Sequence, residues 1–148
     1  MPSVRIRAAD QRPSTSIDRE PEAIVIFTSD KGTQAALRAA AQVARASGKG
    51  MLLVIPELVS FSLAHESPPI AVDHLVQRFW PRISSLDVVT RVQVVLCNDE
   101  MAALKRMLKS PSLIFLGGSP GWWWPTEERR LARSLRRQGH EVIFVNED

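Results

Sequence analysis

The chain has 148 residues, of which 45% are hydrophobic and 24% charged, the composition of one globular domain that can bury its own core. Its one cysteine excludes an intramolecular disulfide, and a formal net charge of +3 does not by itself indicate nucleic-acid binding. No apolar run approaches the ~20 residues of a membrane span and no secretory segment opens the chain, so we expect a cytoplasmic protein without membrane insertion.

Residues 1–21 mix arginine with serine, proline and aspartate and bury too little to offset the entropy of ordering. We therefore predict a flexible N-terminal tail over 1–21 and one folded domain over 22–148. Within the tail only Val4–Arg7 has the pattern of a short edge strand. The alternative interpretation of the tail is an electrostatic arm for a partner.

The rest of the chain alternates between apolar β-branched runs and amphipathic segments. Strands are predicted over 22–28, 51–55, 88–96, 113–116 and 141–145. Helices are predicted over 33–47, 70–80 and 100–109, and a last one from a cap at Thr126 to Gly139. Pro56 is expected to stop the second strand, and Pro81 to end or kink the second helix.

This alternation predicts right-handed crossovers and an α/β fold: a Rossmann-like three-layer sandwich around a mostly parallel five-stranded sheet. In such sheets ligands bind at the carboxyl ends of the strands, where the strand order reverses. The loops over 28–33, 56–69 and 117–126 are therefore the candidate ligand-binding segments.

The loop after the fourth strand carries a family resemblance. Its residues 118–121 read Gly-Ser-Pro-Gly directly after a buried strand. Over 22–145 the chain resembles the universal stress protein family, which has the same alternation and the phosphate-binding pattern G-x2-G-x9-G-(S/T). Gly118 to Gly121 match the first half of that pattern, whereas Leu131-Ala132 stand where its second half requires glycine and serine or threonine.

The resemblance implies an adenine nucleotide as ligand, ATP or AMP with Mg²⁺. Asp30 matches the acidic residue that the family places after its first strand, and the glycines would let a phosphate approach free backbone N–H groups. The candidate nucleotide-contacting residues are Thr28, Asp30, Gly118, Ser119 and Gly121. Because Glu127 and Glu128 would each repel a triphosphate by about 1 kcal/mol or more, the phosphate loop is interpreted as partly lost.

Three consecutive tryptophans, Trp122, Trp123 and Trp124, lie in the same loop and cannot all face one core. Exposed aromatic side chains gather where proteins bind partners, so we predict a contact with a protein partner or a ligand ring. The alternative interpretation is that all three cover the apolar ends of helices.

The last strand is short and apolar. Its edge residues are Val142, Ile143, Phe144 and Val145. Domains like universal stress proteins pair this strand with a two-fold mate, so a homodimer is expected. The alternative is a monomer whose edge the N-terminal tail covers.

The function predicted is a regulatory or binding module of the universal stress protein type, linked to an adenine nucleotide. No catalytic residue and no metal site are predicted, because the histidines lie on different elements without an obvious nucleophile. A low-turnover nucleotide hydrolase, a flavin-binding flavodoxin-like protein and an accessory module of a transporter or kinase remain as alternatives. The arginines of the last helix are interpreted as a solvated face, and nucleic acid is not expected as a partner.

Overall fold

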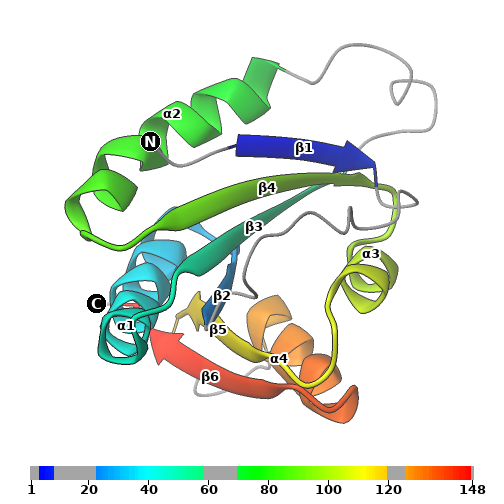
Figure 1. The fold of residues 1–148 in the computed structure, drawn as a ribbon. Helices are drawn as coiled ribbons and strands as arrows, with labels where there is room; N and C mark the ends of the chain where they lie inside the picture. Colours follow the sequence, from blue (N-terminus) through cyan, green and yellow to red (C-terminus); the bar gives the residue numbers. More distant parts are fainter. Residues whose placement is uncertain (1–3, 9–22, 59–69, 120–125, 148) are drawn as a thin grey trace.

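The computed structural model describes residues 4–8, 23–58, 70–119 and 126–147 (Figure 1). They form a six-stranded sheet in the order β1-β4-β3-β2-β5-β6, in which every neighbouring pair is parallel. The strands are β1 (Val4–Ala8), β2 (Ala23–Ile26), β3 (Met51–Leu58), β4 (Thr90–Cys97), β5 (Leu113–Gly118) and β6 (Glu141–Asn146). The helices are α1 (Asp30–Ser47), α2 (Ile70–Ser85), α3 (Glu100–Met107) and α4 (Glu127–Arg137).

This architecture confirms the α/β class and the parallel sheet between two helical layers. All five predicted strands form, and β1 adds a sixth at the edge of the sheet, where Val4 pairs with Val92 of β4. Part of the segment predicted as a tail therefore joins the sheet, while residues 9–22 lie outside the described residues.

Two apolar cores pack against the two faces of the sheet, because successive side chains of a strand point to opposite faces. On one face Val25 of β2 and Leu53 of β3 pack with the small residues of α1 and with Phe79 of α2. On the other face Ile24 and Leu52 pack with buried leucines of α3 and α4. Figure 1 shows α1 on one side of the sheet and α4 on the other.

Helix α1 begins three residues before its predicted start because Ser29 caps it. The Ser29 hydroxyl accepts a hydrogen bond from the backbone N–H of Gly32 at 3.1 Å, which satisfies one free donor of the first turn. The helix ends at Gly48, whose φ of 70° is the left-handed conformation that glycine adopts without strain. Within the helix, small alanine side chains allow close packing on the sheet.

Both prolines expected to end an element lie inside one. Strand β3 runs through Pro56 to Leu58. Successive residues of a parallel strand direct their backbone N–H and C=O groups alternately to the two neighbouring strands. Val54 directs its groups to the β2 side, because its carbonyl accepts a hydrogen bond from the N–H of Phe27, just past the end of β2. Pro56, two residues after Val54, faces the same side of β3. Because β2 has already ended at that level, no strand is there to accept a hydrogen bond, and the missing N–H of the proline costs none.

Helix α2 continues through Pro81 to Ser85, so the predicted end at Trp80 is wrong. Phe79 and Ile83 lie on either side of Pro81 and are both buried against the sheet. Burial of two large apolar side chains contributes about 1.5–3 kcal/mol each, which offsets the roughly 3 kcal/mol cost of a proline in a helix.

Among the helices of the described part, none is long and apolar enough to cross a bilayer.

Candidate functional site

The strand order reverses between β2 and β5. From β2 the chain proceeds through β3 to β4 on one side, and it then crosses to β5 and β6 on the other side. Loops that leave neighbouring strands at such a reversal point diverge, and the crevice between them is the usual ligand site of an open α/β sheet. Here the crevice lies between Ser29, which follows β2, and Ser119, which follows β5.

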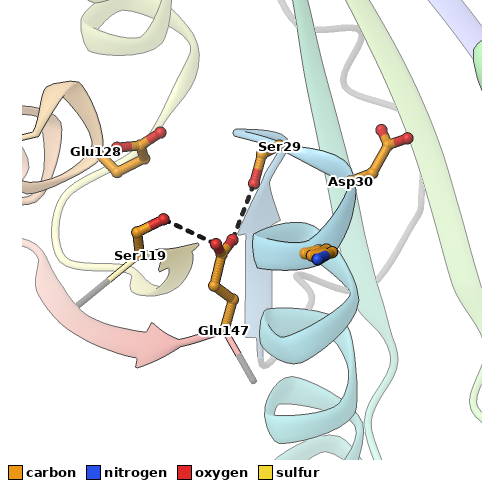
Figure 2. Close-up of a pocket in the computed structure, with 6 residues that line it drawn as sticks. Ser29, Asp30, Ser119, Glu128 and Glu147 are labelled. Carbon is orange, nitrogen blue, oxygen red and sulfur yellow. Dashed lines mark hydrogen bonds between the residues drawn. The ribbon is translucent and has the colours of Figure 1, made fainter. Parts of the chain in front are cut away.

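A pocket with a volume of about 260 Å³ opens at this point (Figure 2). The residues that line it come from the ends of β2, β5 and β6 and from the first turns of α1 and α4. They are Ser29, Asp30, Lys31, Ser119, Glu128 and Glu147. The lining thus combines two hydroxyls, three carboxylates and one ammonium group.

The carboxylate of Glu147 lies between the two hydroxyls (Figure 2). Ser119 Oγ donates to Glu147 Oε1 at 2.7 Å, and Ser29 Oγ donates to Glu147 Oε2 at a longer 3.5 Å. The backbone N–H of Glu147 donates to the Gly118 carbonyl at 2.9 Å, which extends the pairing of β5 with β6 by one residue. Glu147 therefore closes the crevice from the β6 side.

The base of the site is a direct backbone contact between α1 and β5. A methyl group added at Gly32 would lie 2.5 Å from the carbonyl oxygen of Gly117, so only glycine allows this approach. Thr28 supports the contact, because its hydroxyl donates to the same Gly117 carbonyl at 2.6 Å. The Thr28 N–H donates to the hydroxyl of the buried Thr33 at 3.1 Å. These bonds hold the two loops at a fixed separation.

Asp30 lines the pocket, but its carboxylate is engaged elsewhere. Arg78 of α2 donates to Asp30 Oδ1 at 3.0 Å, with about half of each side chain exposed. Such a pair contributes about 0–1 kcal/mol, so it orients the carboxylate more than it stabilises the fold. Figure 2 shows Asp30 turned away from Glu147.

Glu128 approaches the pocket from α4. It stands in the acidic first turn of that helix, whose Thr126 cap accepts a hydrogen bond from the Arg129 N–H at 3.3 Å. The aliphatic part of the Glu128 side chain packs over Gly118. A methyl group added at Gly118 would lie 3.2 Å from the Glu128 side chain and 2.9 Å from the Phe144 ring. The lack of a side chain at Gly118 thus lets α4 and β6 close over the end of β5.

The structure places four of the five predicted nucleotide-contacting residues at this crevice. Asp30 and Ser119 line the pocket, while Thr28 and Gly118 lie in the backbone layer that supports it. Gly121 and the tryptophans Trp122, Trp123 and Trp124 lie outside the described residues. Sequence reasoning missed Glu147, because residues 147 and 29 are 118 positions apart and no motif links them.

The two most reactive side-chain types in the described chain do not line the pocket. Burial raises the pKa of the Cys97 thiol, and the charges of Glu100, Asp99 and Glu57 raise it further, so this thiol stays protonated. His140 is buried, its Nδ1 accepts from the Ser112 N–H at 3.2 Å, and burial lowers its pKa. It is a neutral structural acceptor. Among the described residues, no three histidine, cysteine or acidic side chains are arranged to hold a metal ion.

The predicted dimer edge lies in β6, at the border of the sheet. Its residues are Val142, Ile143, Phe144 and Val145. Glu141 and Glu147 direct their N–H groups to β5. Because the direction alternates along a strand, the even-numbered residues of β6 direct their backbone groups away from β5, to the open edge of the sheet. The outward carbonyl of Val142 accepts from Arg136 Nη2 at 2.9 Å, so α4 covers part of this edge. Pairing of two chains here stays a prediction.

Comparison with known proteins finds likeness in structure alone. The chain matches no protein-family model and no curated protein sequence. A structure of a protein from the universal stress protein family of Burkholderia pseudomallei is similar at 19% identity and a TM-score of 0.56, over 82% of this chain and 95% of that one. A universal stress protein in complex with cAMP is similar at 17% identity and a TM-score of 0.57, over 86% and 98% of the two chains.

A third similar structure is the universal stress protein of Archaeoglobus fulgidus in complex with dAMP. Its identity to this chain is 14% and its TM-score 0.54, over 85% of this chain and 98% of that one. At such identities the likeness establishes a shared fold. The fold of this chain is therefore that of the universal stress proteins.

Proposed function

We propose that this chain is a regulatory module of the universal stress protein type that binds an adenine nucleotide between the carboxyl ends of β2 and β5. The observation that carries the proposal is the convergence of Ser29 and Ser119 on one pocket at the point where the strand order reverses. Two structures that share the fold contain cAMP and dAMP, which supports an adenine nucleotide as the ligand class.

The charges of the pocket favour a ligand with one phosphate. Lys31 and the start of α1 supply positive potential, since the free N–H groups of a helix N-terminus attract anions. The carboxylates of Asp30, Glu128 and Glu147 lower this positive potential. A nucleoside monophosphate brings the smallest charge to these groups, whereas ATP with Mg²⁺ would bring three phosphates to them. We therefore propose AMP or a cyclic monophosphate as the principal ligand and ATP as a weaker one.

Replacing Ser119 with phenylalanine is expected to abolish nucleotide binding, because the ring would project into the pocket and the substitution would remove one of its two hydroxyls. The measurement is isothermal titration calorimetry with AMP and cAMP, together with the melting temperature in each ligand. Ser84→Phe is the matched control, because Ser84 is exposed on α2 and is not part of the pocket lining. That variant should bind as the wild type does.

Equal binding by Ser119→Phe and the wild type would place the nucleotide elsewhere and refute the proposed site. A wild type that binds neither nucleotide at millimolar concentration would refute the proposed function itself. A ligand that binds the folded state at 100 times its Kd raises stability by about 2.7 kcal/mol, so the melting curves would detect useful binding independently.

The other predicted properties are part of the same proposal. They are action through binding rather than turnover, a homodimer through β6, a protein partner at the tryptophan loop, and a cytoplasmic location. Among the described residues the pocket lining contains no aromatic ring for a flavin and no histidine for acid–base catalysis. The low-turnover nucleotide hydrolase, the flavodoxin-like protein and the accessory module of a transporter or kinase remain the alternative functions.

A further inference from the structure

The two hydroxyls of the proposed nucleotide site already have an anionic acceptor within the chain. A serine hydroxyl has one proton to donate and two lone pairs that accept. Ser29 accepts from the Gly32 N–H, and its hydroxyl also makes a long contact of 3.5 Å with Glu147 Oε2. Ser119 donates its proton to the other oxygen of the same carboxylate at 2.7 Å. The Glu147 carboxylate therefore occupies the position that a phosphate would need in order to accept hydrogen bonds from these two hydroxyls.

The backbone of Glu147 is held while its side chain can rotate. Its N–H donates to the Gly118 carbonyl at 2.9 Å, so the residue continues the pairing of β5 with β6. The carboxylate is held through Ser119 and, at a longer distance, through Ser29. A change of the Glu147 side-chain rotamer would therefore free both hydroxyls without disturbing the sheet.

From this arrangement we infer that the Glu147 carboxylate is an intramolecular competitor for the phosphate position of the nucleotide site. The inference rests on the proposed function and adds the regulation of that site. An incoming phosphate must displace the Glu147 carboxylate. Because the backbone of Glu147 is fixed, the displaced carboxylate stays close to the bound phosphate and repels it. Affinity for the ligand therefore falls with every phosphate charge, while a nucleoside without a phosphate is unaffected. Glu147 thus weakens the binding of ligands that carry phosphate, and of polyphosphates most.

The test compares AMP with adenosine on three variants by calorimetry. Glu147→Gln removes the charge and keeps the size of the side chain, and Glu147→Ala removes both. Glu141→Gln is the matched control, because it removes an equal charge from the exposed start of the same strand. The expected result is about a tenfold or greater gain in AMP affinity for both Glu147 variants, equivalent to about 1.4 kcal/mol or more. Adenosine affinity should change less than about twofold, and Glu141→Gln should match the wild type.

The outcomes separate this inference from the proposed function. If all variants bind AMP with the affinity of the wild type, the competitor role is wrong and the nucleotide site stands. A loss of AMP affinity in the Glu147 variants would make Glu147 a ligand contact and would also overturn the inference. If adenosine and AMP bind to no variant, both the site and its regulation are refuted.

Discussion

Replacing Gly32 with alanine is expected to destabilise the protein by about 3 kcal/mol, the upper end of the range for overpacking. The new methyl group would lie 2.5 Å from the oxygen and 2.7 Å from the carbon of the Gly117 carbonyl, both backbone atoms that cannot rotate away. Helix α1 would have to move off the end of β5. For a chain of this size the melting temperature should fall by about 6–12 °C.

Thermal unfolding followed by circular dichroism measures this effect, and Gly48→Asn is the control. Gly48 has a φ of 70° and open space where a side chain would lie, and asparagine tolerates that conformation. The control should therefore lose less than about 1 kcal/mol. If Gly32→Ala melts at the temperature of Gly48→Asn, the backbone contact between α1 and β5 at the base of the site does not exist.

Replacing Phe79 with alanine is expected to cost about 3–5 kcal/mol of stability. Phe79 is fully buried, and its ring meets the ring of Phe27 edge to face at a centroid separation of 5.6 Å. The guanidinium groups of Arg78 and Arg82 lie 5.9 Å and 5.8 Å from its centre. The substitution would open a cavity beneath α2 and loosen the helix that holds Asp30 through Arg78.

Chemical denaturation with urea measures this loss, because the midpoint and the slope can be compared with those of the wild type. Val89→Ala is the control, since its side chain is 80% exposed and should contribute within about 0.5 kcal/mol. If Phe79→Ala lowers the free energy of unfolding by no more than Val89→Ala does, α2 is not anchored to the sheet through the Phe79 ring.

Local patterns were sufficient to predict the core of the fold. The five apolar runs became strands because each is short, rich in large apolar residues and followed by a turn or a capping residue, such as Ser29 after β2 and Asp99 after β4. The predictions failed where tertiary contacts offset a local penalty. Pro56 is accepted in β3 because β2 has already ended, and Pro81 is accepted in α2 because Phe79 and Ile83 are buried on either side of it.

The site was predictable only where a loop motif marked it. Ser119 belongs to a glycine-containing loop after a strand, and Asp30 follows the first predicted strand, so both could be found from their neighbours in sequence. Glu147 could not be found in this way. Its role depends on the parallel pairing of β5 with β6, which brings residue 147 beside Gly118. A single sequence does not specify that neighbour relation.

The most direct measurement is a titration of isotope-labelled protein with AMP, followed by the backbone amide signals in solution. The expected result is saturable shifts concentrated in residues 28–33, 117–119 and 147, with small changes along α3 and the start of β4. Shifts that leave those three segments unchanged, or no shift at millimolar AMP, would contradict a nucleotide site between the ends of β2 and β5.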